Sequence, residues 1–137
     1  MKYLLFSIFI AGAALAWAQV PPAGPGTDIR VQTPAELTKT AAELEQQVVR
    51  QPKNVDLYVK LGFTYTRLGK ADDAQRAFEN AVRLDPKKAI AHYMLGLVYE
   101  KKGFKDKAVA AWRACLESPA EQRLHDTARK HLHLLTR

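Results

Sequence analysis

Few of the residue types that build catalytic sites occur in this sequence. Cys115 is the only cysteine, and Ser7 and Ser118 are the only serines, among the 137 residues. No nucleophile with a neighbouring base and an orienting group can be assembled from them. The sequence also has no glycine-rich phosphate loop and no Cys-x-x-Cys-His haem motif. We therefore expect no enzyme activity, no cofactor and no small-molecule substrate.

Histidine is scarce as well, and its spacing is not that of a metal site. His131 and His133 are two residues apart, which places them on different faces of a helix. No group of carboxylate, histidine and cysteine side chains has the spacing of metal ligands. Solvated helix faces are the expected location of the histidines. A metal site built from His125, His131 and His133 is the alternative.

A long apolar run occurs only at the N-terminus. Lys2 is followed by an uncharged, mostly apolar stretch over residues 3–15 and then by Ala16-Trp17-Ala18. This order is typical of a secretory signal peptide over residues 1–18, cleaved between Ala18 and Gln19. We expect a secreted or periplasmic protein whose net charge falls from +7 to +6 when Lys2 is removed. An uncleaved anchor is the alternative, and we expect membrane contact only in that case.

Proline and glycine gather in residues 19–33, which predicts a solvated, disordered tether without a core. Thr33-Pro34-Ala35-Glu36 then predicts the start of a helix. Thr33 would be the N-cap, Pro34 the first helical residue, and Glu36 the partner that completes a capping box.

Most of the remaining chain is one pattern that occurs twice, 34 residues apart, over residues 55–88 and 89–122. Self-similarity at this period is typical of solenoid repeats. Apolar residues recur at three and four positions, which predicts helices, and a glycine ends the first helix of each copy. The identical pairs are Leu61/Leu95, Gly62/Gly96, Tyr65/Tyr99, Gly69/Gly103, Asp72/Asp106, Ala74/Ala108 and Ala77/Ala111, with Phe78/Trp112 and Ala81/Cys115 as similar pairs.

This pattern resembles the tetratricopeptide repeat, a helix-turn-helix unit of the same length. The resemblance covers residues 34–136 and implies an all-α fold, a short right-handed α-solenoid with extra helices at both ends. Residues 34–51 would be the second helix of a degenerate half repeat. Residues 122–136, after a slip of one residue in register at Pro119, would be a capping helix with a polar outer face.

The resemblance also implies a module for protein–protein interaction. In this family, the first helices of the repeats line a concave groove that holds a peptide or helix of a partner. The lysine and asparagines with which one branch of the family clamps a C-terminal carboxylate are absent here. Coverage of the groove by the tether or by the last helix is the alternative. The groove residues would be Val59, Phe63, Thr66, Tyr93, Leu97 and Glu100.

Lysines gather at the turn inside the second copy. They are Lys101, Lys102, Lys105 and Lys107. In an exported protein, this basic patch favours an acidic protein partner or an anionic envelope surface over nucleic acid. Solvated charge without a role is the alternative.

These patterns together predict an exported adaptor or assembly factor that binds a protein or peptide partner. A structural module that self-associates through its helical faces is the alternative function. Cys115 stands at the small, inward position that Ala81 holds in the first copy, which predicts a buried thiol. An intermolecular disulfide is the alternative for an exported protein with an odd cysteine.

Overall fold

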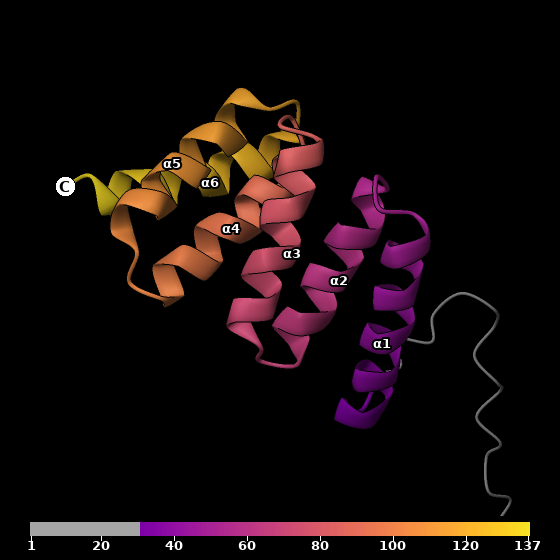
Figure 1. Cartoon of the computed structure of the whole chain (residues 1–137). Helices are drawn as coiled ribbons and strands as arrows, with labels where there is room; N and C mark the ends of the chain where they lie inside the picture. Colours follow the sequence, from indigo (N-terminus) through magenta and orange to yellow (C-terminus); the bar gives the residue numbers. More distant parts are fainter. Residues whose placement is uncertain (1–30) are drawn as a thin grey trace, which may run out of the picture. The chain divides into compact units, whose positions relative to one another are not determined.

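Six α-helices follow one another along the part of the chain that the structure, a computed structural model, describes: residues 31–137 (Figure 1). They are α1 (Pro34–Arg50), α2 (Val55–Arg67), α3 (Ala71–Leu84), α4 (Ala89–Lys101), α5 (Lys105–Glu117) and α6 (Gln122–Leu135), and this region holds no strand. The predicted all-α solenoid is therefore confirmed. The predicted signal peptide, and the tether as far as residue 30, lie outside the described residues.

Helix neighbours in sequence are also neighbours in space. α2 packs on α3, and α4 packs on α5, so that each copy of the repeat is one helical hairpin. α1 packs on α2 at one end, and α6 packs on α5 and also contacts α4 at the other, as Figure 1 shows. Residues Gln32–Arg137 form one unit by their contacts. No helix in residues 31–137 combines the length and the apolar character that crossing a membrane requires.

The ends of the helices follow the local chemistry of the sequence. The backbone N–H of Glu36 donates to Thr33 Oγ1 at 3.3 Å, and the backbone N–H of Thr33 donates to Glu36 Oε2 at 2.8 Å. This confirms the predicted capping box. Gly69 and Gly103 have φ values of 71° and 75° after α2 and α4, in the left-handed region that glycine adopts without strain.

Phe78 and Trp112 are the largest fully buried side chains among the described residues. Each ring lies against the glycine of the first helix in its own repeat. A Cβ atom at Gly62 would come within 2.6 Å of the Phe78 ring, and one at Gly96 within 2.5 Å of the Trp112 ring. The mid-helix glycines are therefore required by the close approach of the aromatic rings.

The two terminal helices complete the core, each with one apolar face. α1 buries Leu37, Ala41 and Leu44. α6 buries Ala128, and the leucines on the same face are half-buried against the core; they are Leu124, Leu132 and Leu135. Both helices therefore shield the apolar ends of the two central hairpins from water.

Candidate functional site

The three predicted groove residues on α2 are in different environments. Val59 is only 9% exposed and belongs to the core, so its predicted exposure is wrong: the side chain packs among buried residues of the repeats. Phe63 is 37% exposed and makes an edge-to-face contact with Phe78, with ring centroids 5.6 Å apart. Thr66 is exposed, and its hydroxyl donates to the Gly62 carbonyl at 2.9 Å. Of the three predicted groove residues on α2, Phe63 and Thr66 are the two that are exposed to a partner.

Two predicted groove residues on α4 are half-buried. Tyr93 contacts Trp112 edge-to-face at a centroid distance of 5.3 Å and keeps part of its surface open. Leu97 packs against the core and is also partly open. Both side chains are therefore open enough to line a groove, although each also contributes to the packing of the repeat.

Glu100, the sixth predicted groove residue, is occupied by groups of the same chain. Its Oε1 accepts a hydrogen bond from Trp112 Nε1 at 2.6 Å and lies 2.9 Å from His131 Nδ1. The His131 ring stacks on the Trp112 indole at 4.6 Å. The expected solvated position of His131 is therefore wrong, because α6 packs with this side chain inward. At Glu100 the last helix covers the predicted groove.

A cleft of about 710 Å³ opens on one side of α4 and α6. Tyr93 is the one predicted groove residue that lines it, and Ile90 and Leu124 add further apolar surface. Residues 119–121 close one side, immediately after the one-residue slip in the repeat register. The other lining residues include Lys88, Glu121, Arg123 and Thr127.

Of the two basic side chains that line the cleft, Lys88 forms an ion pair within the described residues and Arg123 does not. Lys88 Nζ forms an ion pair with Asp56 Oδ1 at 2.8 Å, and this hydrogen bond, with the charge of Lys88, lowers the pKa of Asp56. Arg123 is exposed, and within residues 31–137 it forms no ion pair. A bound segment would therefore meet an apolar floor and a free guanidinium at the edge.

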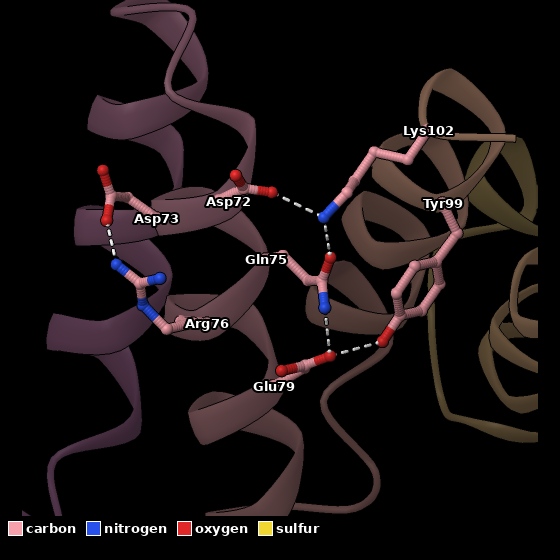
Figure 2. Close-up of polar contacts among 7 residues, drawn as sticks. All are labelled: Asp72, Asp73, Gln75, Arg76, Glu79, Tyr99 and Lys102. Carbon is pink, nitrogen blue, oxygen red and sulfur yellow. Dashed lines mark hydrogen bonds and ion pairs between the residues drawn. The ribbon is translucent and has the colours of Figure 1, made fainter. Parts of the chain in front are cut away.

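The predicted basic patch is divided by the structure. Figure 2 shows that Lys102 reaches across to α3, where its Nζ lies 2.6 Å from Asp72 Oδ1 and 2.7 Å from Gln75 Oε1. This contact lowers the pKa of Asp72. Lys102 is therefore part of the interface between the two repeats. Lys101, Lys105 and Lys107 remain exposed.

The same interface continues through two more hydrogen bonds. Gln75 Nε2 donates to Glu79 Oε1 at 2.8 Å, and the Tyr99 hydroxyl donates to the same oxygen at 2.7 Å (Figure 2). Burial, and secondly the hydrogen bond to Glu79, raise the pKa of Tyr99. The phenol therefore stays protonated and able to donate. These contacts stabilise the arrangement of α3 and α4.

The geometry offers no arrangement for metal chemistry in residues 31–137, where no three metal-ligating side chains come together. It offers repeated helical hairpins with a side cleft. The family model for the tetratricopeptide repeat matches residues 59–123. Residues 59–123 of the chain are therefore tetratricopeptide repeats. Proteins of this family are generally non-catalytic modules for protein–protein interaction, and the fold supports that class of function.

Relatives and a solved structure agree with this family. The chain is 30% identical over 88 residues to the peroxisomal targeting signal receptor of Komagataella phaffii, a match that covers 64% of this chain and 15% of the receptor. It is 38% identical over 60 residues to a TPR repeat-containing protein of Methanocaldococcus jannaschii, covering 44% of this chain and 10% of the relative. The crystal structure of MamA superposes with a TM-score of 0.67 at 25% identity, covering 74% of this chain and 57% of MamA.

These coverages limit the comparison to the repeat region. The chain matches about a seventh or less of the length of these two relatives. The likeness therefore identifies the repeats that the proteins share and leaves the partner of this chain to be inferred from its own surface.

Proposed function

We propose that this tetratricopeptide-repeat protein is an exported adaptor or assembly factor that holds a helix or extended peptide of a partner protein. The observation that carries the proposal is the cleft between α4 and α6, with apolar side chains on its floor and charged groups at its edge. Grooves of this kind accept an apolar anchor while the polar rim excludes water. The N-terminal signal pattern supports the exported location.

Ile90, Tyr93 and Leu124 give the cleft its affinity for an apolar side chain. Aromatic and arginine side chains are enriched among the residues that dominate binding energy at protein interfaces. Tyr93 and Arg123 supply both types within one cleft. A partner segment with an apolar anchor next to an acidic residue fits this surface best.

Phe63 provides a second exposed aromatic side chain, on α2. We propose that it contacts the same partner, with Thr66 beside it on the helix. The covered Glu100 and the buried Val59 act on the groove indirectly, because they hold α4, α6 and α2 in place. The partner-binding surface is thus smaller than the six positions that the family pattern implies.

The test is a substitution that fills the cleft without disturbing the core. Thr127 lines the cleft, and its hydroxyl bonds only to the Arg123 carbonyl of its own helix. Thr127→Arg places a long side chain in the cleft. Thr38→Arg on α1 is the matched control, because Thr38 is exposed and its hydroxyl makes the same bond one turn back, to Pro34.

Capture of partners from an envelope extract, read by mass spectrometry, compares the two variants with the parent. We expect a partner that binds the parent and Thr38→Arg but is lost with Thr127→Arg, with an affinity reduced by about two orders of magnitude, or about 2.7 kcal/mol. A partner retained equally by all three proteins would place binding outside the cleft.

Phe63→Glu tests the α2 contribution. A glutamate against an apolar ligand loses its hydration without gaining a partner, which costs several kcal/mol. Binding should fall strongly, while stability should fall by only about 0.5–1.5 kcal/mol from the lost contact with Phe78. Sedimentation of the parent at several concentrations tests the alternative function, self-association. If the parent forms a dimer and Phe63→Glu dissociates it, the exposed face of α2 is a self-association surface.

A further inference from the structure

The segment that joins α4 to α5, taken with the last residue of α4 and the first turn of α5 (residues 101–107), has one exposed aromatic side chain surrounded by lysines. Phe104 is 42% exposed and is the N-cap residue of α5. It therefore lies at the end of the hairpin that α4 and α5 form in Figure 1. Lys102 Nζ is 5.1 Å from the centre of its ring, and Lys107 Nζ is 5.5 Å from it. We name residues 101–107 the basic turn.

The basic turn carries an excess of positive charge that the rest of the described chain does not neutralise. Its four lysines and Asp106 leave a net charge of +3, which the ion pair of Lys102 with Asp72 on α3 reduces to +2. Lys102 is paired with Asp72, but Lys101, Lys105 and Lys107 are exposed and in no ion pair within residues 31–137. The nearby carboxylate of Glu100 contacts Trp112 and His131 instead of the lysines of the basic turn.

A hollow of about 450 Å³ lies beside the ring and is lined by the residues of the turn from Gly103 to Lys107. It includes the N-terminus of α5, which has no side-chain cap. The N-terminus of a helix favours negative charge, because its first N–H groups point outward and lack partners within the helix. Lys105 and Lys107 stand on the first turn of this helix and add to the attraction.

We propose that the basic turn is a docking site for an anionic lipid bilayer. The phenyl ring of Phe104 enters the interface between headgroups and acyl chains, and the three free lysines lie at the level of the lipid phosphates. This interaction is separate from the proposed capture of a protein partner in the α4–α6 cleft and does not depend on it.

The shape of the site favours a bilayer over an acidic peptide. The apolar group is a single side chain at the end of a hairpin, which can enter a flat surface. The hollow beside it is lined by five consecutive residues, Gly103–Lys107, which is too short a stretch to form a groove along an extended peptide. Lysines suit this place, because their long aliphatic stems pack on apolar surface while their ammonium groups stay in the polar layer. Each lysine near the surface of an anionic bilayer raises the binding constant about fivefold.

The experiment is sedimentation of the full chain with vesicles of phosphatidylcholine alone, or of phosphatidylcholine mixed with phosphatidylglycerol. Residues 1–18, which are mostly apolar and include Lys2, are present in every sample, so the comparison between variants isolates the basic turn. We expect binding to the anionic vesicles to exceed that to the neutral vesicles and to weaken with added salt.

The test variant is Lys101→Gln, Lys105→Gln and Lys107→Gln combined, and its expected effect is a loss of about a hundredfold in binding to the anionic vesicles. The matched control is Lys39→Gln, Lys53→Gln and Lys60→Gln combined. It removes the same charge from exposed positions on or near α1 and α2. The control should bind almost as the parent does, and equal losses in both triple variants would overturn the proposal.

Phe104→Ser tests insertion of the ring separately from charge, with an expected loss of about tenfold. Leu134→Ser, at an exposed leucine on α6, is its control and should have little effect. Soluble poly-glutamate separates a bilayer from an acidic protein. If poly-glutamate binds through the three lysines while Phe104→Ser binds vesicles as the parent does, the basic turn contacts an acidic protein and the bilayer proposal is wrong.

Discussion

The ring of His131 on α6 stacks on the indole of Trp112 on α5, with centroids 4.6 Å apart and planes inclined by 21°. Both side chains also reach one carboxylate, that of Glu100 on α4. Three helices therefore meet at one polar contact above a buried aromatic ring. The contact determines how α6 lies on the second repeat, and α6 contributes Leu124 and Thr127 to the lining of the side cleft.

His131→Ala should loosen α6 and lower the free energy of unfolding by about 1–2 kcal/mol, because it removes the ring stack and one hydrogen bond. Urea unfolding measures this loss, and hydrogen exchange should show it first in α6. His133→Ala is the control, since His133 is exposed on the same helix. Equal stability of the two variants would mean that the stack does not hold the helix.

Phe78→Ala and Trp112→Ala should each destabilise the fold by about 3–5 kcal/mol, because each leaves a large cavity in a fully buried site. Thermal or urea unfolding gives the value. Phe104→Ala serves as the control for loss of an aromatic ring at an exposed site, where a much smaller effect is expected. Melting temperatures within a few degrees of the parent for both core variants would contradict the packing described above.

Gly62→Ala and Gly96→Ala should destabilise the protein although alanine is the better helix former by about 1 kcal/mol. The added Cβ would lie 2.6 Å and 2.5 Å from buried rings that cannot move into open space. Overpacking of this kind costs about 1–3 kcal/mol. Ala110→Gly, at an exposed site on α5, is the control for propensity alone. A stabilised Gly62→Ala variant would show that the ring has room to shift.

Cys115 should react very slowly with a thiol reagent in the native protein. Its side chain is fully buried, and burial raises the pKa of the thiol, so the reactive thiolate is rare at neutral pH. Labelling should accelerate in urea as the fold opens. Ala110→Cys in a Cys115→Ala background is an exposed control that should react at once. Fast labelling of the parent, or a disulfide-linked dimer on a non-reducing gel, would contradict this prediction.

The exported protein should begin at Gln19, because small residues at Ala16 and Ala18 suit signal peptidase. The intact mass of the periplasmic or secreted protein gives the answer. Ala18→Arg should block cleavage and leave the full-length chain in the membrane fraction. If the parent itself is retained there at full mass, the N-terminal segment is an anchor.

Helix positions and helix ends could be predicted from the sequence, because they depend on interactions within a few residues. The capping box at Thr33 and the left-handed turns at Gly69 and Gly103 are examples. The repeat of 34 residues also places Phe78 and Trp112 at matching positions, and both rings are fully buried. Since Gly62 and Gly96 stand at matching positions, their close contacts with Phe78 and Trp112 could be expected in both copies.

Whether each predicted site residue is exposed to solvent was decided only by the tertiary structure. Lys102 pairs with Asp72, 30 residues away, and Glu100 meets His131, 31 residues away. Such contacts depend on how neighbouring repeats and the last helix are oriented, and helical periodicity alone does not contain that orientation. The chain's own sequence therefore determined the repeat and its core, while packing between helices decided that Val59 and Glu100 are enclosed and that Tyr93 and Phe104 remain open.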